Sequence, residues 1–161
     1  ILSFIEKYIL EHKINFDVIA GGETAGIPYA AFLAERLNKP MIYIRKKQKG
    51  FGKNSQIEGK YEKNQKCILI EDLATDGKSK AIFVEAMRNN NLKVTDTFVI
   101  FYYDIFEKEK LELNKMGIKI HFLCSWSHIL NEIKKIKILE NKNIESLEKF
   151  LFKPNEWKYN E

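Results

Sequence analysis

Apolar positions along this chain follow two different periods, one typical of helices and one typical of short buried strands. Helical spacing predicts six helices, at residues 1–13, 26–38, 79–90, 107–117, 125–136 and 144–152. Short apolar runs predict five strands, at residues 16–21, 41–45, 67–72, 94–104 and 118–125. Strands and helices alternate, and most strands are apolar on both sides, which is typical of a parallel sheet with helices on both faces. We therefore expect an α/β fold in which residues 1–161 form a single domain.

The composition is that of an ordinary soluble globular protein, with 45% hydrophobic and 30% charged residues. No run of about 18 apolar residues predicts a membrane span, and no leader pattern is present, so we expect a cytoplasmic protein without a membrane partner. Because the chain begins at Ile1 inside a helical pattern, we expect that an N-terminal part of the domain lies outside this sequence. Cys67 and Cys124 lie in apolar runs and are interpreted as small buried side chains, not as a disulfide or metal site.

Three polar segments follow the first three predicted strands. The segment 21–26, GGETAG, comes after the first strand, a basic stretch at 45–66 comes after the second, and two acids with a glycine-containing turn at 71–79 come after the third. In parallel α/β sheets, ligands bind beyond the carboxyl ends of the strands. The pattern therefore predicts that these three segments meet at one edge of the sheet and form a ligand site.

The third segment places Glu71 and Asp72 immediately before a turn that leads into a helix. The tail of this turn matches a P-loop, but Asp72 stands where that motif needs its first glycine, which argues against a P-loop ATPase. Carboxylates accept strong hydrogen bonds from sugar hydroxyls or hold a hydrated magnesium ion, while the backbone N–H groups of the turn can bind a phosphate. Acids for a ribose beside a loop for its phosphate predict a phosphoribosyl ligand; the alternative is a solvated strand end.

The second segment carries eight Lys or Arg residues and two Glu between positions 45 and 66. The connection is longer than most loops, and such loops are often mobile functional elements. We interpret about 45–60 as a mobile loop whose charges neutralise a departing pyrophosphate, although a simple solvated loop has the same composition. In the first segment, Gly21 and Gly22 would let the backbone approach a diphosphate closely.

The sequence ILIEDLATDGKSK at 68–80 resembles the phosphoribosyl pyrophosphate motif of type I phosphoribosyltransferases. The sequence YIRKKQKGFGKNSQIEG at 43–59 resembles the catalytic loop of orotate phosphoribosyltransferases, whose pattern is Arg-Lys-x-x-Lys-x-His-Gly. With AGGETAGIP, the match extends over roughly 16–88 and more weakly to the C-terminus. The resemblance implies magnesium-dependent displacement of pyrophosphate from the sugar C1 by a ring nitrogen of orotate, which gives orotidine 5'-monophosphate in pyrimidine biosynthesis.

The resemblance also implies roles for individual residues. Arg45, Lys46 and Lys49 would be catalytic and contact the pyrophosphate, partly from the neighbouring subunit of a homodimer. Glu71 and Asp72 would hold the ribose hydroxyls. The other residues at the phosphoribosyl pyrophosphate site would be Leu73, Ala74, Thr75, Asp76, Gly77, Lys78 and Ser79. The pyrophosphate loop would be Gly21, Gly22, Glu23, Thr24 and Ala25.

Two further roles follow from the same resemblance. Thr75 would also lie near orotate, and Mg²⁺ would arrive with the substrate, with Asp72 as its one possible protein ligand. The implied partners are phosphoribosyl pyrophosphate, orotate and a second copy of the chain, with no nucleic acid.

The sequence departs from the family pattern in four places. Phe51 occupies the usual histidine position of the loop, Ala25 replaces a lysine that many relatives have, and Glu71 replaces an aspartate. No arginine is present at 101–104, where many orotate enzymes place one for the carboxylate of the base. Transfer to another nucleobase therefore remains an alternative. A second alternative is a non-catalytic regulator on the same fold that binds nucleic acid through the basic loop, although only Phe51 and Tyr61 interleave aromatic rings with the basic residues.

Overall fold

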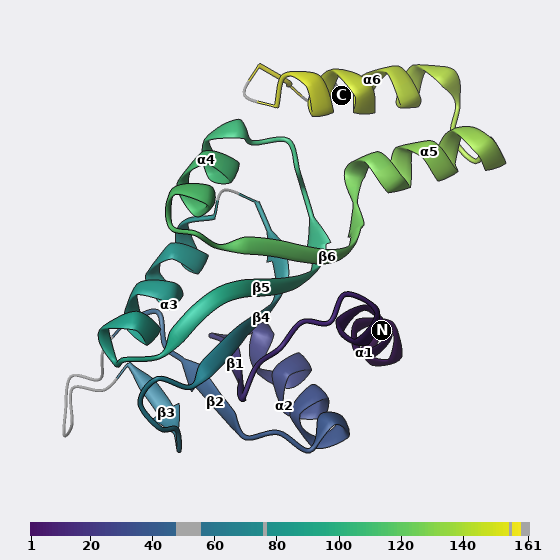
Figure 1. Cartoon of the computed structure of the whole chain (residues 1–161). Helices are drawn as coiled ribbons and strands as arrows, with labels where there is room; N and C mark the ends of the chain where they lie inside the picture. The colour runs from purple at the N-terminus through teal and green to yellow at the C-terminus, as the bar shows by residue number, and fades with distance from the viewer. Residues whose placement is uncertain (48–55, 76, 155, 159–161) are drawn as a thin grey trace.

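The computed structural model describes residues 1–47, 56–75, 77–154 and 156–158, and its centre is a six-stranded sheet (Figure 1). The strands are β1 (Val18–Gly22), β2 (Met41–Ile44), β3 (Ile57–Gly59), β4 (Lys66–Ala74), β5 (Lys93–Tyr102) and β6 (Lys119–Ser125). The helices are α1 (Leu2–Glu11), α2 (Gly26–Leu37), α3 (Lys78–Asn89), α4 (Glu107–Lys115), α5 (Trp126–Ile136) and α6 (Asn141–Phe152). All six predicted helices and all five predicted strands are confirmed.

The sheet has the strand order β3-β2-β1-β4-β5-β6, and the five predicted strands are parallel. The exception is β3, which pairs antiparallel with β2 through Ile57 opposite Ile44. The prediction of a loop over 45–60 is therefore wrong for 57–59. A strand of three residues is too short to show a period, and it forms here because Ile57 is buried against β2.

Helices cover both faces of the sheet, as the alternation predicted. On one face, α1 and α2 pack their apolar residues against Ile68 and Ile70 of β4 and against Phe98 of β5. On the other face, α3 packs against Cys67 and Leu69 of β4. Successive residues of β4 thus point to opposite helical layers, which is why the strand is apolar throughout. In Figure 1, α1 and α2 lie on one side of the sheet and α3 and α4 on the other.

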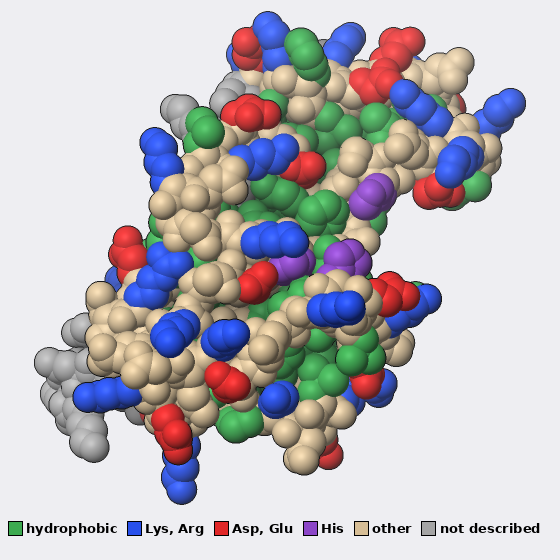
Figure 2. Space-filling model, viewed as in Figure 1, with side chains coloured by type: hydrophobic (Ala, Val, Ile, Leu, Met, Phe, Trp, Pro, Cys, Tyr) green, Lys and Arg blue, Asp and Glu red, His purple; other side chains and the backbone are tan. Residues whose placement is uncertain are grey.

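The last two helices, α5 and α6, leave the end of β6 and extend away from the sheet (Figure 1). Their inner side is aromatic, because the Trp126 ring meets Phe101, Tyr103 and Phe150 edge-on at 5.4–6.2 Å between ring centroids. Lys and Arg side chains on the face shown in Figure 2 are interspersed with Asp and Glu and do not form one continuous patch. In the described ranges, no helix combines the length and apolar content that a membrane crossing requires.

The two cysteines are free thiols in different surroundings. Cys67 is buried in β4, and burial raises the pKa of its thiol to about 12. Cys124 is half-buried. At neutral pH the Cys67 thiol is protonated, so it behaves as a small apolar side chain of the core.

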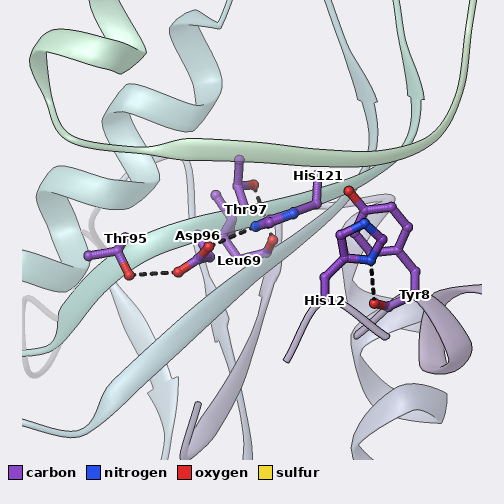
Figure 3. Close-up of polar contacts among 7 residues, drawn as sticks. All are labelled: Tyr8, His12, Leu69, Thr95, Asp96, Thr97 and His121. Atoms are coloured by element: carbon purple, nitrogen blue, oxygen red, sulfur yellow. Dashed lines mark hydrogen bonds and ion pairs between the residues drawn. The ribbon is translucent and has the colours of Figure 1, made fainter. Parts of the chain in front are cut away.

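A polar cluster links α1 to the edge of the sheet, and Figure 3 shows it from close by. His121 of β6 is 1% exposed, and its Nε2 lies 2.7 Å from Oδ1 of Asp96 on β5. The Tyr8 and His121 rings form a T-shaped pair with 5.7 Å between centroids, and the Tyr8 ring also stacks on the His12 ring. Within the described residues, Nδ1 of His121 is buried without a hydrogen-bond partner. The pKa of His121 is lowered, first by burial, while its contact with Asp96 opposes the shift.

This lowered pKa predicts that the protein loses stability on mild acidification. An unfolded histidine takes up a proton near pH 6.5, whereas the buried His121 resists protonation until lower pH, so the unfolded state binds more protons. The free energy of unfolding therefore falls as the pH drops below about 6.5, by at most about 1.4 kcal/mol per pH unit from this residue. Urea unfolding at a series of pH values measures the slope.

The matched comparison is His121→Gln, which keeps an N–H donor for Asp96 and does not titrate. This variant should lose part of the slope below pH 6.5, while His128→Gln, at an exposed position, should retain it. Equal slopes in wild type and His121→Gln would show that His121 does not carry the acid sensitivity.

Candidate functional site

A cleft of about 370 Å³ lies at the carboxyl ends of β1, β2 and β4. It is lined by residues of all three predicted segments, namely Glu23, Thr24, Ala25, Lys46, Glu71, Asp72, Leu73, Thr75, Gly77, Ser79 and Lys80. The predicted meeting of the three segments is therefore confirmed, while their contacts with a ligand stay predictions. Two larger hollows of about 720 Å³ each lie along α6 and between α1 and α2; the second shares Ala25 and Asp72 with the cleft.

The first segment turns from β1 into α2 and is tied to the second by hydrogen bonds. The backbone N–H of Glu23 donates to the Ile44 carbonyl at 2.9 Å. The Glu23 carboxylate in turn accepts a hydrogen bond from the backbone N–H of Lys46 at 2.7 Å. These two hydrogen bonds hold the ends of β1 and β2 together at one wall of the cleft. The peptide bond between Glu23 and Thr24 is cis.

The structure gives a packing reason for glycine at Gly21 and Gly22, while their close approach to a diphosphate stays a prediction. Both residues are buried at the end of β1, and an added Cβ would meet the protein itself. At Gly21 it would lie 2.8 Å from Cα of Ile27, and at Gly22 it would lie 2.4 Å from Oε1 of Glu71. The glycines are required because α2 and the Glu71 side chain pack directly against the backbone of β1.

The second segment is only partly brought to the cleft. Lys46 lines it and is exposed. Arg45 is not among the described lining residues; its backbone bonds to Gln56, and its guanidinium lies 3.9 Å from the carboxylate of Glu58 on β3. The predicted catalytic Lys49, the unusual Phe51 and the rest of 48–55 lie outside the described residues.

The third segment begins inside β4, because this strand continues past the acidic pair to Ala74. Asp72 is half-buried and lines the cleft, and Leu73 beside it is exposed. The turn reaches α3 through Gly77, which has a φ of 68° and caps the helix. Asp76 lies outside the described residues, and Lys78 is the exposed first residue of α3.

The N-terminus of α3 faces the cleft through Gly77, Ser79 and Lys80. Within the described residues, no side chain caps this helix end. The first N–H groups of a helix have no partner inside the helix, and the helix dipole makes this end positive. The end of α3 is therefore suited to an anion such as a phosphate.

The interaction that sequence reasoning missed is a buried ion pair under the cleft. Nζ of Lys80 lies 2.9 Å from Oε2 of Glu71, and these residues are 1% and 6% exposed. Burial is the main cause that raises the pKa of Glu71, and Lys80 opposes it. A signal was present in the sequence, since Lys80 shares the helical face of Phe83, Val84 and Met87, all of them buried. A lysine on a buried helical face needs a partner, and Glu71 is that partner.

The chain is similar to known proteins both in sequence and in structure. The phosphoribosyl transferase domain model matches residues 1–134. The orotate phosphoribosyltransferase of Roseobacter denitrificans is 47% identical over 142 residues, which are 88% of this chain and 63% of that protein. The chain thus spans less than two thirds of the length of such curated relatives.

Two solved structures have a similar fold. The orotate phosphoribosyltransferase of Aeropyrum pernix matches with a TM-score of 0.69 and 27% identity, over 83% of this chain and 73% of that one. The UMP synthase of Leishmania donovani matches with a TM-score of 0.76 and 27% identity, over 93% of this chain and 32% of that one. Because the family model covers most of the chain and the cleft lies where the sequence motif predicted it, this chain belongs to the phosphoribosyl transferase domain family.

Proposed function

We propose that the full-length protein is an orotate phosphoribosyltransferase. It would transfer the phosphoribosyl group of phosphoribosyl pyrophosphate to orotate and release pyrophosphate and orotidine 5'-monophosphate, a step of pyrimidine biosynthesis. The observation that carries the proposal is the cleft in which an acidic strand end, the N-terminus of α3 and a basic segment meet. The name and 47% identity of the Roseobacter denitrificans relative support the choice of orotate.

In this reaction the bond between the sugar C1 and the pyrophosphate oxygen breaks, and a bond between C1 and a ring nitrogen of orotate forms. Asp72 would accept hydrogen bonds from the ribose hydroxyls. The 5-phosphate would lie on the turn 74–79 at the end of α3, which the dipole of this helix makes favourable. Lys46 and Lys49 would neutralise the negative charge that grows on the leaving pyrophosphate, and this is the main electrostatic contribution we propose.

Magnesium is the cofactor we propose. Among the described residues, no three Asp, Glu, His or Cys side chains come together as a metal site. The donors present suit an ion that arrives with its substrate, since Mg²⁺ keeps several waters and binds one or two carboxylates together with substrate phosphates. Asp72 is the carboxylate that fits, because Glu71 is buried against Lys80 and the Glu23 carboxylate accepts the Lys46 N–H. When bound, the ion would offset the charge of the pyrophosphate.

We further propose a cytoplasmic homodimer in which the basic loop contributes to the site of the neighbouring subunit. The loop leaves β2 beside the cleft at Lys46 and returns to the sheet at β3. A nucleic-acid-binding regulator on the same fold is less well supported, because the 47% identical relative from Roseobacter denitrificans is named as an orotate phosphoribosyltransferase.

A panel of bases tests the proposal. The full-length protein is mixed with phosphoribosyl pyrophosphate, Mg²⁺ and one base at a time, and the loss of the base is followed by chromatography. Orotate should be consumed, whereas uracil, hypoxanthine and adenine should remain. The missing arginine at 101–104 makes another base the second candidate. Consumption of a purine with orotate untouched would overturn the orotate assignment and leave only the class of reaction.

A further inference from the structure

Among the described residues that line the cleft, Lys80 and Glu71 are the two that are both charged and almost fully buried. Lys80 lies in the first turn of α3, and its ammonium group donates hydrogen bonds to two acceptors on β4. One is Oε2 of Glu71 at 2.9 Å, and the other is the Leu73 carbonyl at 2.7 Å. The two bonds flank Asp72, so Lys80 contacts the residues on both sides of the carboxylate that faces the cleft.

The charges around the cleft show why this contact matters for a ligand. The described lining residues include three carboxylates, Glu23, Glu71 and Asp72, and two lysines, Lys46 and Lys80. A polyphosphate is repelled by each uncompensated carboxylate, and burial makes this repulsion strong because little water screens it. Glu71 cannot turn into solvent, since its carboxylate lies against the backbone of Gly22 on one side and Lys80 on the other.

We propose that Lys80 is a positioning residue that neutralises Glu71 and holds the end of β4, so that the cleft can accept a polyphosphate next to Asp72. Lys80 acts through Glu71 and the Leu73 carbonyl and is not itself required to touch the ligand. The inference deepens the proposed function and rests on its anion site, but it concerns affinity for the diphosphate and not the identity of the base.

The test measures binding of inorganic pyrophosphate, which has no ribose and needs no turnover. Wild-type protein, Lys80→Met and the double variant Lys80→Met/Glu71→Gln are titrated by calorimetry in the presence of Mg²⁺. The titrations use an alkaline buffer that keeps the Glu71 carboxyl ionised, because its pKa rises further when Lys80 is removed. The titrations are run well below the melting temperature of each variant, and circular dichroism checks that each protein is folded. Lys115→Met, which removes an exposed lysine of α4 outside the cleft, is the matched control for the loss of one positive charge.

Lys80→Met should bind pyrophosphate at least tenfold more weakly, because one uncompensated charge about 10 Å away at an effective dielectric constant of about 20 has an effect of roughly this size. The double variant should regain most of the lost affinity, since it removes both charges of the pair, and Lys115→Met should bind like wild type. If Lys80→Met lowers only the melting temperature and the Kd is unchanged, the pair is purely structural and the proposal is wrong. If the double variant binds as weakly as Lys80→Met, neutralisation of Glu71 is not the cause and the proposal is also wrong.

A second measurement applies if Lys80→Met does not fold. Glu71→Gln leaves the ammonium of Lys80 without its counter-charge, so pyrophosphate should bind several-fold more tightly than to wild type. Unchanged or weaker binding by Glu71→Gln would overturn the proposal. The proposed reaction is tested independently of the role of Lys80. A wild-type protein that binds pyrophosphate but transfers no phosphoribosyl group to any base would refute the reaction and leave the role of Lys80 intact.

Discussion

Lys49→Ala should lower kcat by roughly 100- to 1000-fold, the size expected when one group that stabilises charge in the transition state is removed. The resemblance to the catalytic loop of orotate phosphoribosyltransferases implies that Lys49 is the loop cation that would reach the leaving pyrophosphate. The negative charge of that group is greatest as its bond to the sugar breaks, so the loss should fall more on kcat than on KM. Steady-state kinetics with varied phosphoribosyl pyrophosphate separate the two constants.

The matched control is Lys47→Ala, which removes an equal charge two residues earlier in the same basic segment, at an exposed position. It should change kcat far less than Lys49→Ala does. Equal losses in the two variants would mean that the loop acts through its total charge and that Lys49 has no specific role.

The same variant tests whether the loop serves the neighbouring subunit. Lys49→Ala and Asp72→Ala are each expected to be nearly inactive, yet a hybrid dimer would contain one site with both an intact loop and an intact Asp72. Random exchange of equal amounts makes half of the dimers hybrids with one good site each, so the mixture should recover about a quarter of wild-type activity. If subunit exchange is confirmed and the mixture stays inactive, the loop serves its own subunit.

Asp72→Asn should weaken the binding of phosphoribosyl pyrophosphate roughly ten- to a hundredfold, because a hydrogen bond to a charged group is worth about 1.5–3 kcal/mol. Its carboxylate is half-buried at the cleft, so little folding stability should be lost. Calorimetry with Mg²⁺ present gives the affinity, and thermal unfolding gives the stability.

Glu85→Gln makes the same change of charge on the exposed side of α3, outside the described lining of the cleft, and is the matched control for Asp72→Asn. It should bind phosphoribosyl pyrophosphate like wild type. An Asp72→Asn protein with unaltered affinity and rate would show that the acidic pair is only the end of a strand.

Much of the fold follows from local sequence patterns. The strands at β4 and β5 are apolar on both sides because each is buried between two helical layers, and this produces a continuous run that is easy to recognise. The short β3 was missed because its three residues are held by pairing with β2 and not by any pattern of their own. β4 also extends two residues past Asp72, since its pairing with β5 continues to Ala74 opposite Tyr102.

The position of the candidate site could be predicted from the sequence, whereas the buried contacts beneath it could not. The meeting of three loops follows from parallel topology alone, which places the carboxyl ends of β1, β2 and β4 at one edge. The buried pair of Glu71 with Lys80 depends on how α3 docks on β4, and the need for glycine at Gly22 depends on where the Glu71 carboxylate then lies. These tertiary contacts join residues that no local pattern relates.

The most direct test of the account is orotate-dependent release of pyrophosphate. Purified full-length protein is supplied with phosphoribosyl pyrophosphate and Mg²⁺, with and without orotate, and both pyrophosphate and nucleotide are measured. We predict that release requires orotate and that one orotidine 5'-monophosphate appears for each pyrophosphate. No release with orotate, or release at the same rate without it and with no nucleotide formed, would contradict the proposed transfer reaction.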